Sequence, residues 1–328
     1  MDQLDIPIVR AEKIIQPLSS GSSRPLLLRL EDGRVAHAKF QHNPQSTRSL
    51  CYDLLGTRLG HQLGCPVPEM VLLDIPRHAI QHMPYLTKYR WRPGLQFATL
   101  YYHQSHPVAK HEIQSLVNLA DLPLSALFEA WLFNHDVKFS HILCVSDPEP
   151  RFILIDHGFI LGGPFRSPAS LWRSRKEFPL PKPLTVMALG VPVRFDFTEA
   201  LDRLVSLPAS TIESALAHTP REWGLKSAER QAILAFLVYR QQKLKHVAEH
   251  LQQVWNARKP ADAPWISKTS TPSDPVSSEP PSTLPDATRE DWVQLSHEEW
   301  PNLPTMDDAP VPKDEEGTPH GASDPHID

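Results

Sequence analysis

The chain has 328 residues, a formal net charge of −5 and a hydrophobic content of 41%. This length allows two structural lobes with a core of useful size. The N-terminal region lacks the apolar core of a signal peptide, and no uninterrupted apolar run approaches the roughly 18 residues of a membrane-spanning helix. These features argue against a membrane protein, and we expect a cytoplasmic one.

Prolines and charges are distributed unevenly along the chain. Residues 260–328 contain 13 of the 34 prolines, 15 acidic residues and only three basic ones, a net charge of −12, whereas residues 1–259 carry +7. Such a segment buries too little apolar surface to offset the entropy lost on ordering. We therefore predict a disordered, proline-rich acidic tail at residues 259–328. The basic body suits a phosphate-bearing ligand, and we do not expect nucleic acid as a partner.

The three cysteines, Cys51, Cys65 and Cys144, lie within apolar patterns and form no CxxC pair. An odd number does not suit a disulfide framework, so we expect buried free thiols in a reducing compartment.

The first forty residues predict three strands. Residues 13–18 alternate weakly between apolar and polar, residues 25–31 are rich in leucine, and residues 34–40 return after Asp32-Gly33, a pair typical of a tight hairpin turn.

A helix and a further strand follow. Apolar residues recur at helical spacing over residues 50–63, Gly64 and Pro66 end the helix, and residues 70–75 indicate a strand. The stretch 76–110 is aromatic and broken by prolines, and we interpret it as a hinge-like connection.

The remaining sequence is mainly helical. Residues 122–134 predict a buried helix, and residues 142–145 and 151–155 predict a hairpin. Helices then continue to about residue 257, and residues 212–217 and 229–254 are the clearest helical segments. We expect an α+β protein in which residues 1–258 form one domain, with a small strand-rich lobe to about residue 90 and a mostly helical lobe from about residue 91.

The loop Ser20-Gly21-Ser22-Ser23-Arg24 is a candidate phosphate-binding loop. Its short side chains would let several backbone N–H groups approach phosphate oxygens, and Arg24 would add a cation. An ordinary polar hairpin turn is the alternative.

Lys39 ends a predicted strand, and Asp53 lies in the helix that follows. A strand lysine that holds phosphates and a helix carboxylate that holds the lysine form such a pair in protein kinases, where the acid is a glutamate. The shorter aspartate leaves open that Asp53 is a carboxylate on the helix surface.

Asp136 follows a strongly apolar helix and precedes a strand. At this position it would orient or deprotonate an acceptor hydroxyl, and Lys138 would neutralise the transferring phosphate. The alternative is that Asp136 caps a turn.

Asp156 comes directly after a strand and before His157-Gly158. Its carboxylate suits Mg²⁺, and the glycine permits a sharp turn behind it. A plain turn is the alternative.

His141 stands where a phosphotransfer loop places asparagine for a second metal. Because imidazole prefers softer transition metals, we expect Mn²⁺ as the alternative to Mg²⁺.

Five segments together resemble the HipA-like kinase family, and the resemblance covers about residues 8–255. They are residues 20–25, 63–69, 130–136, 154–158 and 220–223. The resemblance implies a two-lobed kinase-like fold, related to protein and phosphatidylinositol kinases, that binds ATP and magnesium. It also implies that Lys39 contacts phosphates, Asp136 is the catalytic acid and Asp156 binds the metal. We expect ATP and an unidentified protein as partners, with phosphate transfer to a Ser/Thr hydroxyl that the chain itself could supply.

Three other interpretations stay open. His141 and Asp53 also suit a nucleotide-binding pseudokinase that acts as a regulatory or interaction module. His111, His135-Asp136 and Asp156 superficially match a metal-dependent phosphohydrolase, although Asp156 ends a strand rather than lying on a helix. In the tail, residues 288–300 could form a short helix that docks on a partner or on the basic body.

Overall fold

The computed structural model describes residues 6–18, 22–77, 92–146 and 148–266. All of them belong to one compact unit. Most of the predicted tail, residues 267–328, lies outside the described residues. The first part of the predicted tail, residues 259–266, is described. It ends in β10 (Trp265–Ile266), which pairs in parallel with β9 (Arg194–Phe195).

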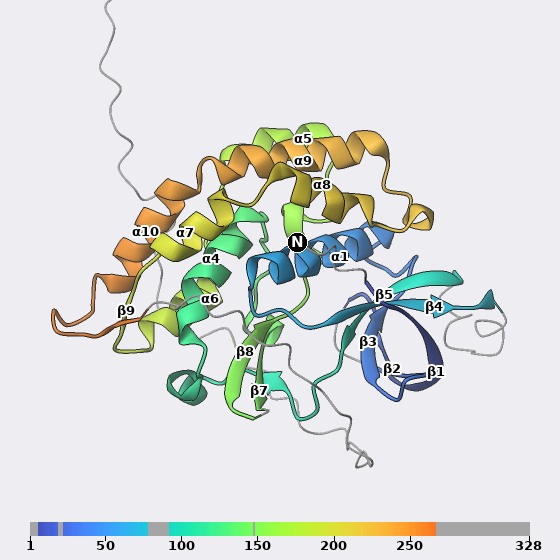
Figure 1. Ribbon diagram of the computed structural model, residues 1–328, viewed down its shortest axis with the longest axis horizontal. Helices are drawn as coiled ribbons and strands as arrows, with labels where there is room; N and C mark the ends of the chain where they lie inside the picture. Colours follow the sequence, from blue (N-terminus) through green and yellow to red (C-terminus); the bar gives the residue numbers. More distant parts are fainter. Residues whose placement is uncertain (1–5, 19–21, 78–91, 147, 267–328) are drawn as a thin grey trace, which may run out of the picture. The chain divides into compact units, whose positions relative to one another are not determined.

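Five strands form a closed barrel in the order β1-β2-β3-β5-β4 (Figure 1). Neighbouring strands are antiparallel except β1 and β4, which are parallel. Apolar side chains such as Leu26, Leu28, Phe40 and Leu73 fill a core of its own inside this barrel. The strands are β1 (Ile8–Pro17), β2 (Leu26–Leu30), β3 (Val35–Lys39), β4 (Met70–Ile75) and β5 (Gly94–Leu100).

The interpretation of residues 76–110 as a hinge-like connection is wrong for β5. This strand pairs with both β3 and β4, so the strand-rich lobe extends to Leu100, beyond the boundary expected near residue 90. Gln96 masked the strand in the sequence because a fully buried amide interrupts its apolar pattern. The amide is satisfied by the backbone N–H of Gln41 and by the carbonyl oxygens of Arg92 and Gly94.

Helix α1 (Thr47–Leu63) follows β3 in the chain and lies between the barrel and the helices of the other lobe (Figure 1). It ends at Gly64, whose φ of 71° is favourable for glycine, as the sequence predicts. Most of its side chains are buried, including Leu50, Leu54 and Leu59, and they join the core of the helical lobe rather than that of the barrel. The packing of the helical lobe therefore determines where α1 lies.

The helical lobe surrounds the largest core. The apolar helix predicted at residues 122–134 is α4, and the predicted segment 229–254 consists of two helices, α9 and α10, separated at Gln242-Lys243. The predicted hairpin is present as β7 and β8, and β6 extends it to three strands. The elements are α4 (Leu122–Trp131), α5 (Pro168–Arg173), α6 (Lys182–Leu189), α7 (Thr198–Val205), α8 (Ala209–Ala217), α9 (Ser227–Gln241), α10 (Leu244–Asn256), β6 (His106–Pro107), β7 (Ile142–Ser146) and β8 (Pro150–Leu154).

The three cysteines are buried free thiols, as expected. Among the described helices, none combines the length and the apolar character that crossing a bilayer requires.

Candidate functional site

Lys39 lies at the centre of the candidate site. Its Nζ atom donates to Asp53 Oδ2 at 2.9 Å and to Asp156 Oδ1 at 2.6 Å. The three residues come from β3, α1 and the turn after β8, and they are separated by up to 117 positions in the sequence. The structure thus brings together the ammonium and the two carboxylates that the sequence singled out.

Burial and charge act in opposite directions on this cluster. Burial alone would lower the pKa of the Lys39 ammonium, but Asp156 and Asp53 outweigh it and raise that pKa. Burial would likewise raise the pKa of Asp156, but Lys39 and His141 hold it well below its usual range. For Asp53 burial dominates and raises the pKa to about 6, against the attraction of Lys39. At neutral pH all three groups are charged, and Asp53 is the one that protonates first on acidification.

A buried ion pair between His157 and Glu129 holds the turn that carries Asp156 in place. Asp156 has a φ of 64°, in the left-handed region that is uncommon for residues other than glycine. The next residue, His157, is fully buried, and its Nε2 lies 3.1 Å from Glu129 Oε1 of α4. Glu129 raises the pKa of His157 against the effect of burial, which favours the protonated form of the imidazole.

The same glutamate also organises the loop of Asp136. Glu129 Oε2 accepts a hydrogen bond from Asn134 Nδ2 at 2.7 Å, and Asn134 Oδ1 accepts one from the backbone N–H of Asp136 at 3.0 Å. Glu129 therefore supports both acidic loops of the site. The sequence analysis does not assign this role to Glu129, although a carboxylate inside the mostly apolar stretch 122–134 is a signal for it.

Asp136 and Lys138 form an ion pair at the edge of the site, with Lys138 Nζ 2.6 Å from Asp136 Oδ1. The Asp136 carboxylate does not contact Lys39 but extends from the loop between α4 and β7. Both side chains are partly exposed to solvent. An acceptor group could therefore reach them from outside.

His141 lies beside Asp156, with its Nε2 atom 3.8 Å from Asp156 Oδ2. Burial lowers the pKa of His141 despite the nearby carboxylates of Asp156 and Asp136. Its Nδ1 atom is buried and has no hydrogen-bond partner among the described residues. The imidazole of His141 and a carboxylate oxygen of Asp156 thus face each other across a gap longer than a hydrogen bond.

The candidate phosphate-binding loop is described only in part. Ser20 and Gly21 lie outside the described residues, whereas Ser22, Ser23 and Arg24 are described. The loop leads into β2, whose first residue, Leu26, pairs with Ala38 beside Lys39. The register therefore places residues 22–24 at the same end of the barrel as Lys39.

A set of hydrogen bonds joins the start of β5 to the 3₁₀ helix Arg221–Trp223. Glu222 Oε1 accepts from the backbone N–H of Leu95 at 2.5 Å and from Gln41 Nε2 at 3.3 Å. Trp223 Nε1 donates to the carbonyl oxygen of Leu95 at 2.7 Å. We call these contacts the β5 clamp. Since β5 pairs with β3 at Phe97 and Lys39, the clamp connects the helical lobe to the strand that carries Lys39.

The phosphohydrolase interpretation finds no support in these contacts. The ring of His135 packs against Phe133, with a centroid distance of 4.4 Å, and Asp156 is bound to Lys39.

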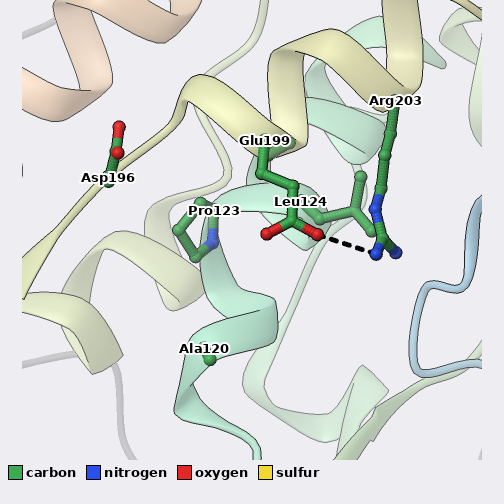
Figure 2. A pocket seen from close by; sticks show the side chains of 7 residues that line it. Ala120, Pro123, Leu124, Asp196, Glu199 and Arg203 are labelled. Atoms are coloured by element: carbon green, nitrogen blue, oxygen red, sulfur yellow. Dashed lines mark hydrogen bonds and ion pairs between the residues drawn. The ribbon is translucent and has the colours of Figure 1, made fainter. Parts of the chain in front are cut away.

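A hollow between α4 and α7 lies apart from the candidate site (Figure 2). It is lined by Pro123, Leu124 and the ion pair of Glu199 with Arg203, and it contains none of the predicted site residues.

Residues 11–167, just under half of the chain, match the family model of HipA-like kinases. This confirms the resemblance that the sequence motifs indicate, and it supports phosphotransferase activity. No curated protein matches the chain significantly in sequence.

Solved structures similar to the chain include several kinases. A Helicobacter pylori proinflammatory kinase, CtkA, is 13% identical over 77% of this chain and 100% of its own, with a TM-score of 0.47. The Golgi casein kinase with Mn/ADP bound is 13% identical over 81% of this chain and 77% of its own, with a TM-score of 0.46. Hydra Fam20 with sugar is 12% identical over 80% of this chain and 88% of its own, with a TM-score of 0.45.

Proposed function

We propose that this chain, which is similar to HipA-like kinases over residues 11–167, is an ATP-dependent phosphotransferase. Its acceptor would be a Ser/Thr hydroxyl of a protein, and the chain itself is one candidate substrate. The observation that carries the proposal is the bonding of Lys39 to both Asp53 and Asp156. A strand lysine, a helix carboxylate and a metal-binding carboxylate after a strand are the parts that kinases use to hold a nucleotide.

The geometry fits a nucleotide phosphate at Lys39. An ammonium has three N–H donors, and two of them are used by the carboxylates of Asp53 and Asp156. No other acceptor among the described residues binds Lys39 Nζ, which leaves the third donor for a phosphate oxygen. Ser22, Ser23 and Arg24, which stand at the same end of the barrel, would supply further donors.

Asp156 and His141 fit a divalent cation. Asp156 Oδ2 and His141 Nε2 are 3.8 Å apart, within the roughly 4.2 Å that two ligands of one ion can span. A cation held there would neutralise the charge that develops on the transferred phosphate. Because one ligand is an imidazole, we propose that Mn²⁺ serves as well as or better than Mg²⁺.

Asp136 is the candidate catalytic acid for the acceptor hydroxyl. Its loop position is fixed by Asn134, and its carboxylate is accessible from solvent. In the proposed reaction it orients the hydroxyl and takes its proton, while Lys138 balances the negative charge of the phosphate.

The second candidate function is a nucleotide-binding pseudokinase. The observation in its favour is His141, because an imidazole in place of an amide weakens a site for Mg²⁺. Such a protein would bind ATP through Lys39 and Asp156 but would transfer no phosphate. It would then act through its interactions with a partner.

ATP binding and phosphate transfer, measured on the full chain in Mg²⁺ and in Mn²⁺, test the proposal. We expect binding and turnover in at least one metal and their loss in Asp156→Ala. Asp202→Ala, which removes an exposed carboxylate of α7, should leave both unchanged and is the matched control. Binding without turnover would favour the pseudokinase, and no binding in either metal would refute both functions.

The role of the acidic tail stays a prediction, since the residues concerned lie outside the described ones. Docking of the tail on a partner or on the body predicts that deletion of residues 267–328 changes activity or partner binding. Unchanged behaviour of the truncated chain would dismiss it.

A further inference from the structure

Three side chains that can bind a metal ion meet on the three-stranded sheet, outside the proposed catalytic site. They are His106 of β6, Glu112 of the 3₁₀ helix Lys110–Ser115, and Cys144 of β7. One nitrogen, oxygen or sulfur atom from each lies within 4.8 Å of the others. His106 and Cys144 are opposite each other in the antiparallel register of β6 and β7, which fixes their proximity.

The backbone orients two of these side chains towards the third. Glu112 Oε2 accepts the N–H of Ala109 at 2.9 Å, which leaves Oε1 directed at His106 Nε2, 2.8 Å away. The other ring nitrogen of His106, Nδ1, lies 3.3 Å from the carbonyl oxygen of Gln104. If Nδ1 donates to that oxygen, Nε2 presents its lone pair to the cluster. Histidines that bind metal ions are commonly oriented in this way by a backbone carbonyl.

We propose that His106, Glu112 and Cys144 form a binding site for a divalent transition metal ion, with Zn²⁺ as the best match. Zinc accepts nitrogen, oxygen and sulfur ligands in one tetrahedral site, and three protein ligands leave the fourth position for water. Ligand distances of about 2.0–2.3 Å place neighbouring ligand atoms about 3.3–3.8 Å apart. The cluster reaches this spacing when His106 Nε2 and Glu112 Oε1 move apart from 2.8 Å and any longer separation, at most 4.8 Å, shortens. The partly exposed His106 and Glu112 side chains have room for these shifts.

The hydrogen bonds that Glu112 makes to His106 and to Ala109 need no metal ion, but they explain only part of the cluster. A proton shared by His106 and Glu112 accounts for their short separation, and the bond of Glu112 to Ala109 caps the 3₁₀ helix. Neither contact involves the buried thiol of Cys144, whose Sγ atom lies 4.0 Å from Ser146 Oγ. A metal ion would replace the shared proton and the thiol proton, so that binding releases protons.

The position of the site gives it a structural effect. β7 begins directly after His141, and its partner strand β8 ends two residues before Asp156. A metal that ties β6 and the 3₁₀ helix to β7 would stabilise the sheet from which both of these side chains extend. The site does not depend on the proposed kinase function.

Cobalt is a suitable probe because a thiolate bound to tetrahedral Co²⁺ gives a charge-transfer absorption band that a carboxylate site does not. The full chain should take up one Co²⁺ with this band, and Zn²⁺ should displace it. We expect the band to be lost in Cys144→Ser and at least about tenfold more Co²⁺ to be required in His106→Gln. Zn²⁺ should raise the melting temperature of the unaltered chain but not of Cys144→Ser.

Three matched variants keep this test specific. Cys65→Ser removes another buried thiol, His111→Ala removes the exposed histidine next to Glu112, and Asp156→Ala removes a ligand of the catalytic site. All three should keep the band. The proposal is overturned if the unaltered chain shows no thiolate band, if Cys144→Ser retains it, or if Cys65→Ser loses it. If Cys144→Ser does not fold, Glu112→Gln replaces it, and unchanged Co²⁺ binding in that variant would equally refute the site.

Discussion

The absence of a side chain at Gly56 allows helix α1 to lie directly against His157. A Cβ atom at position 56 would stand 2.5 Å from His157 Cβ and 2.8 Å from His157 Cγ, closer than such atoms approach in proteins. A Cβ atom added at Gly158 would likewise stand 2.9 Å from Asp53 Oδ2. Two glycines thus permit the contact between α1 and the Asp156 turn on which the Lys39 cluster depends.

Gly56→Ala should therefore destabilise the protein, even though alanine is a better helix former than glycine by about 1 kcal/mol. The added methyl group meets the base of a buried side chain rather than a flexible end, so α1 or the turn must shift. We expect a net loss of about 1–3 kcal/mol in the free energy of unfolding, measured by urea denaturation, and weaker ATP binding. Gly190→Ala is the control, because its Cβ would make only ordinary contacts at 3.4 Å. Equal stability of the two variants would contradict this packing argument.

His141→Asn should transfer phosphate faster than the unaltered chain in Mg²⁺. An amide oxygen is a better ligand for this hard cation than an imidazole nitrogen. A tenfold gain would correspond to about 1.4 kcal/mol of barrier, and initial rates in Mg²⁺ and in Mn²⁺ measure it. The preference for Mn²⁺ should decrease in the same variant. His135→Asn, at an exposed histidine of the same loop, should change neither rate. An equal or slower rate in His141→Asn would show that the histidine does not limit the reaction.

The activity should decrease on acidification, with a midpoint near pH 6. Burial raises the pKa of Asp53 to about 6, so its carboxylate is charged at pH 7 and mostly protonated at pH 5. Protonation removes one of the two negative charges that hold Lys39 in position. The measurement is kcat/KM between pH 5 and 8, with circular dichroism to verify that the protein stays folded.

Asp53→Asn supplies the control for this pH dependence. The amide cannot titrate, so the variant should be less active at pH 7 and should lack the acidic limb near pH 6. An unchanged limb in Asp53→Asn would assign the titration to another group.

Variants of the β5 clamp should reduce activity without touching the nucleotide. Trp223→Phe removes the indole N–H that binds the Leu95 carbonyl oxygen, and Glu222→Ala leaves the Leu95 N–H without its carboxylate. Each loss should cost about 1 kcal/mol of stability. Because β5 pairs with β3 beside Lys39, we also expect a higher KM for ATP.

Arg221→Ala, at an exposed neighbour in the same 3₁₀ helix, is the control for the clamp. It should leave both stability and KM as they are. If Trp223→Phe and Glu222→Ala behave like Arg221→Ala, the clamp does not position Lys39.

Local patterns in the sequence were sufficient for most of the fold. Alternation and turn residues indicate β2, β3, β4 and the β7–β8 hairpin, because a strand exposes its period within a few residues. They were insufficient for β5, where Gln96 breaks the apolar pattern and is satisfied only by backbone groups from elsewhere. The break between α9 and α10 was missed for a related reason, since the apolar spacing continues across it.

The sequence by itself determined which groups are available to the site: a lysine at the end of a strand, an acid in the next helix, an acid before a strand and another directly after one. It did so because each of these residues is placed by the local structure around it. Only the tertiary structure decided that Lys39 binds Asp53 and Asp156 together, that Glu129 supports both acidic loops, and that Glu222 and Trp223 hold β5. These contacts join segments far apart in the chain, and their geometry depends on how α1 packs into the helical core, which no local pattern encodes.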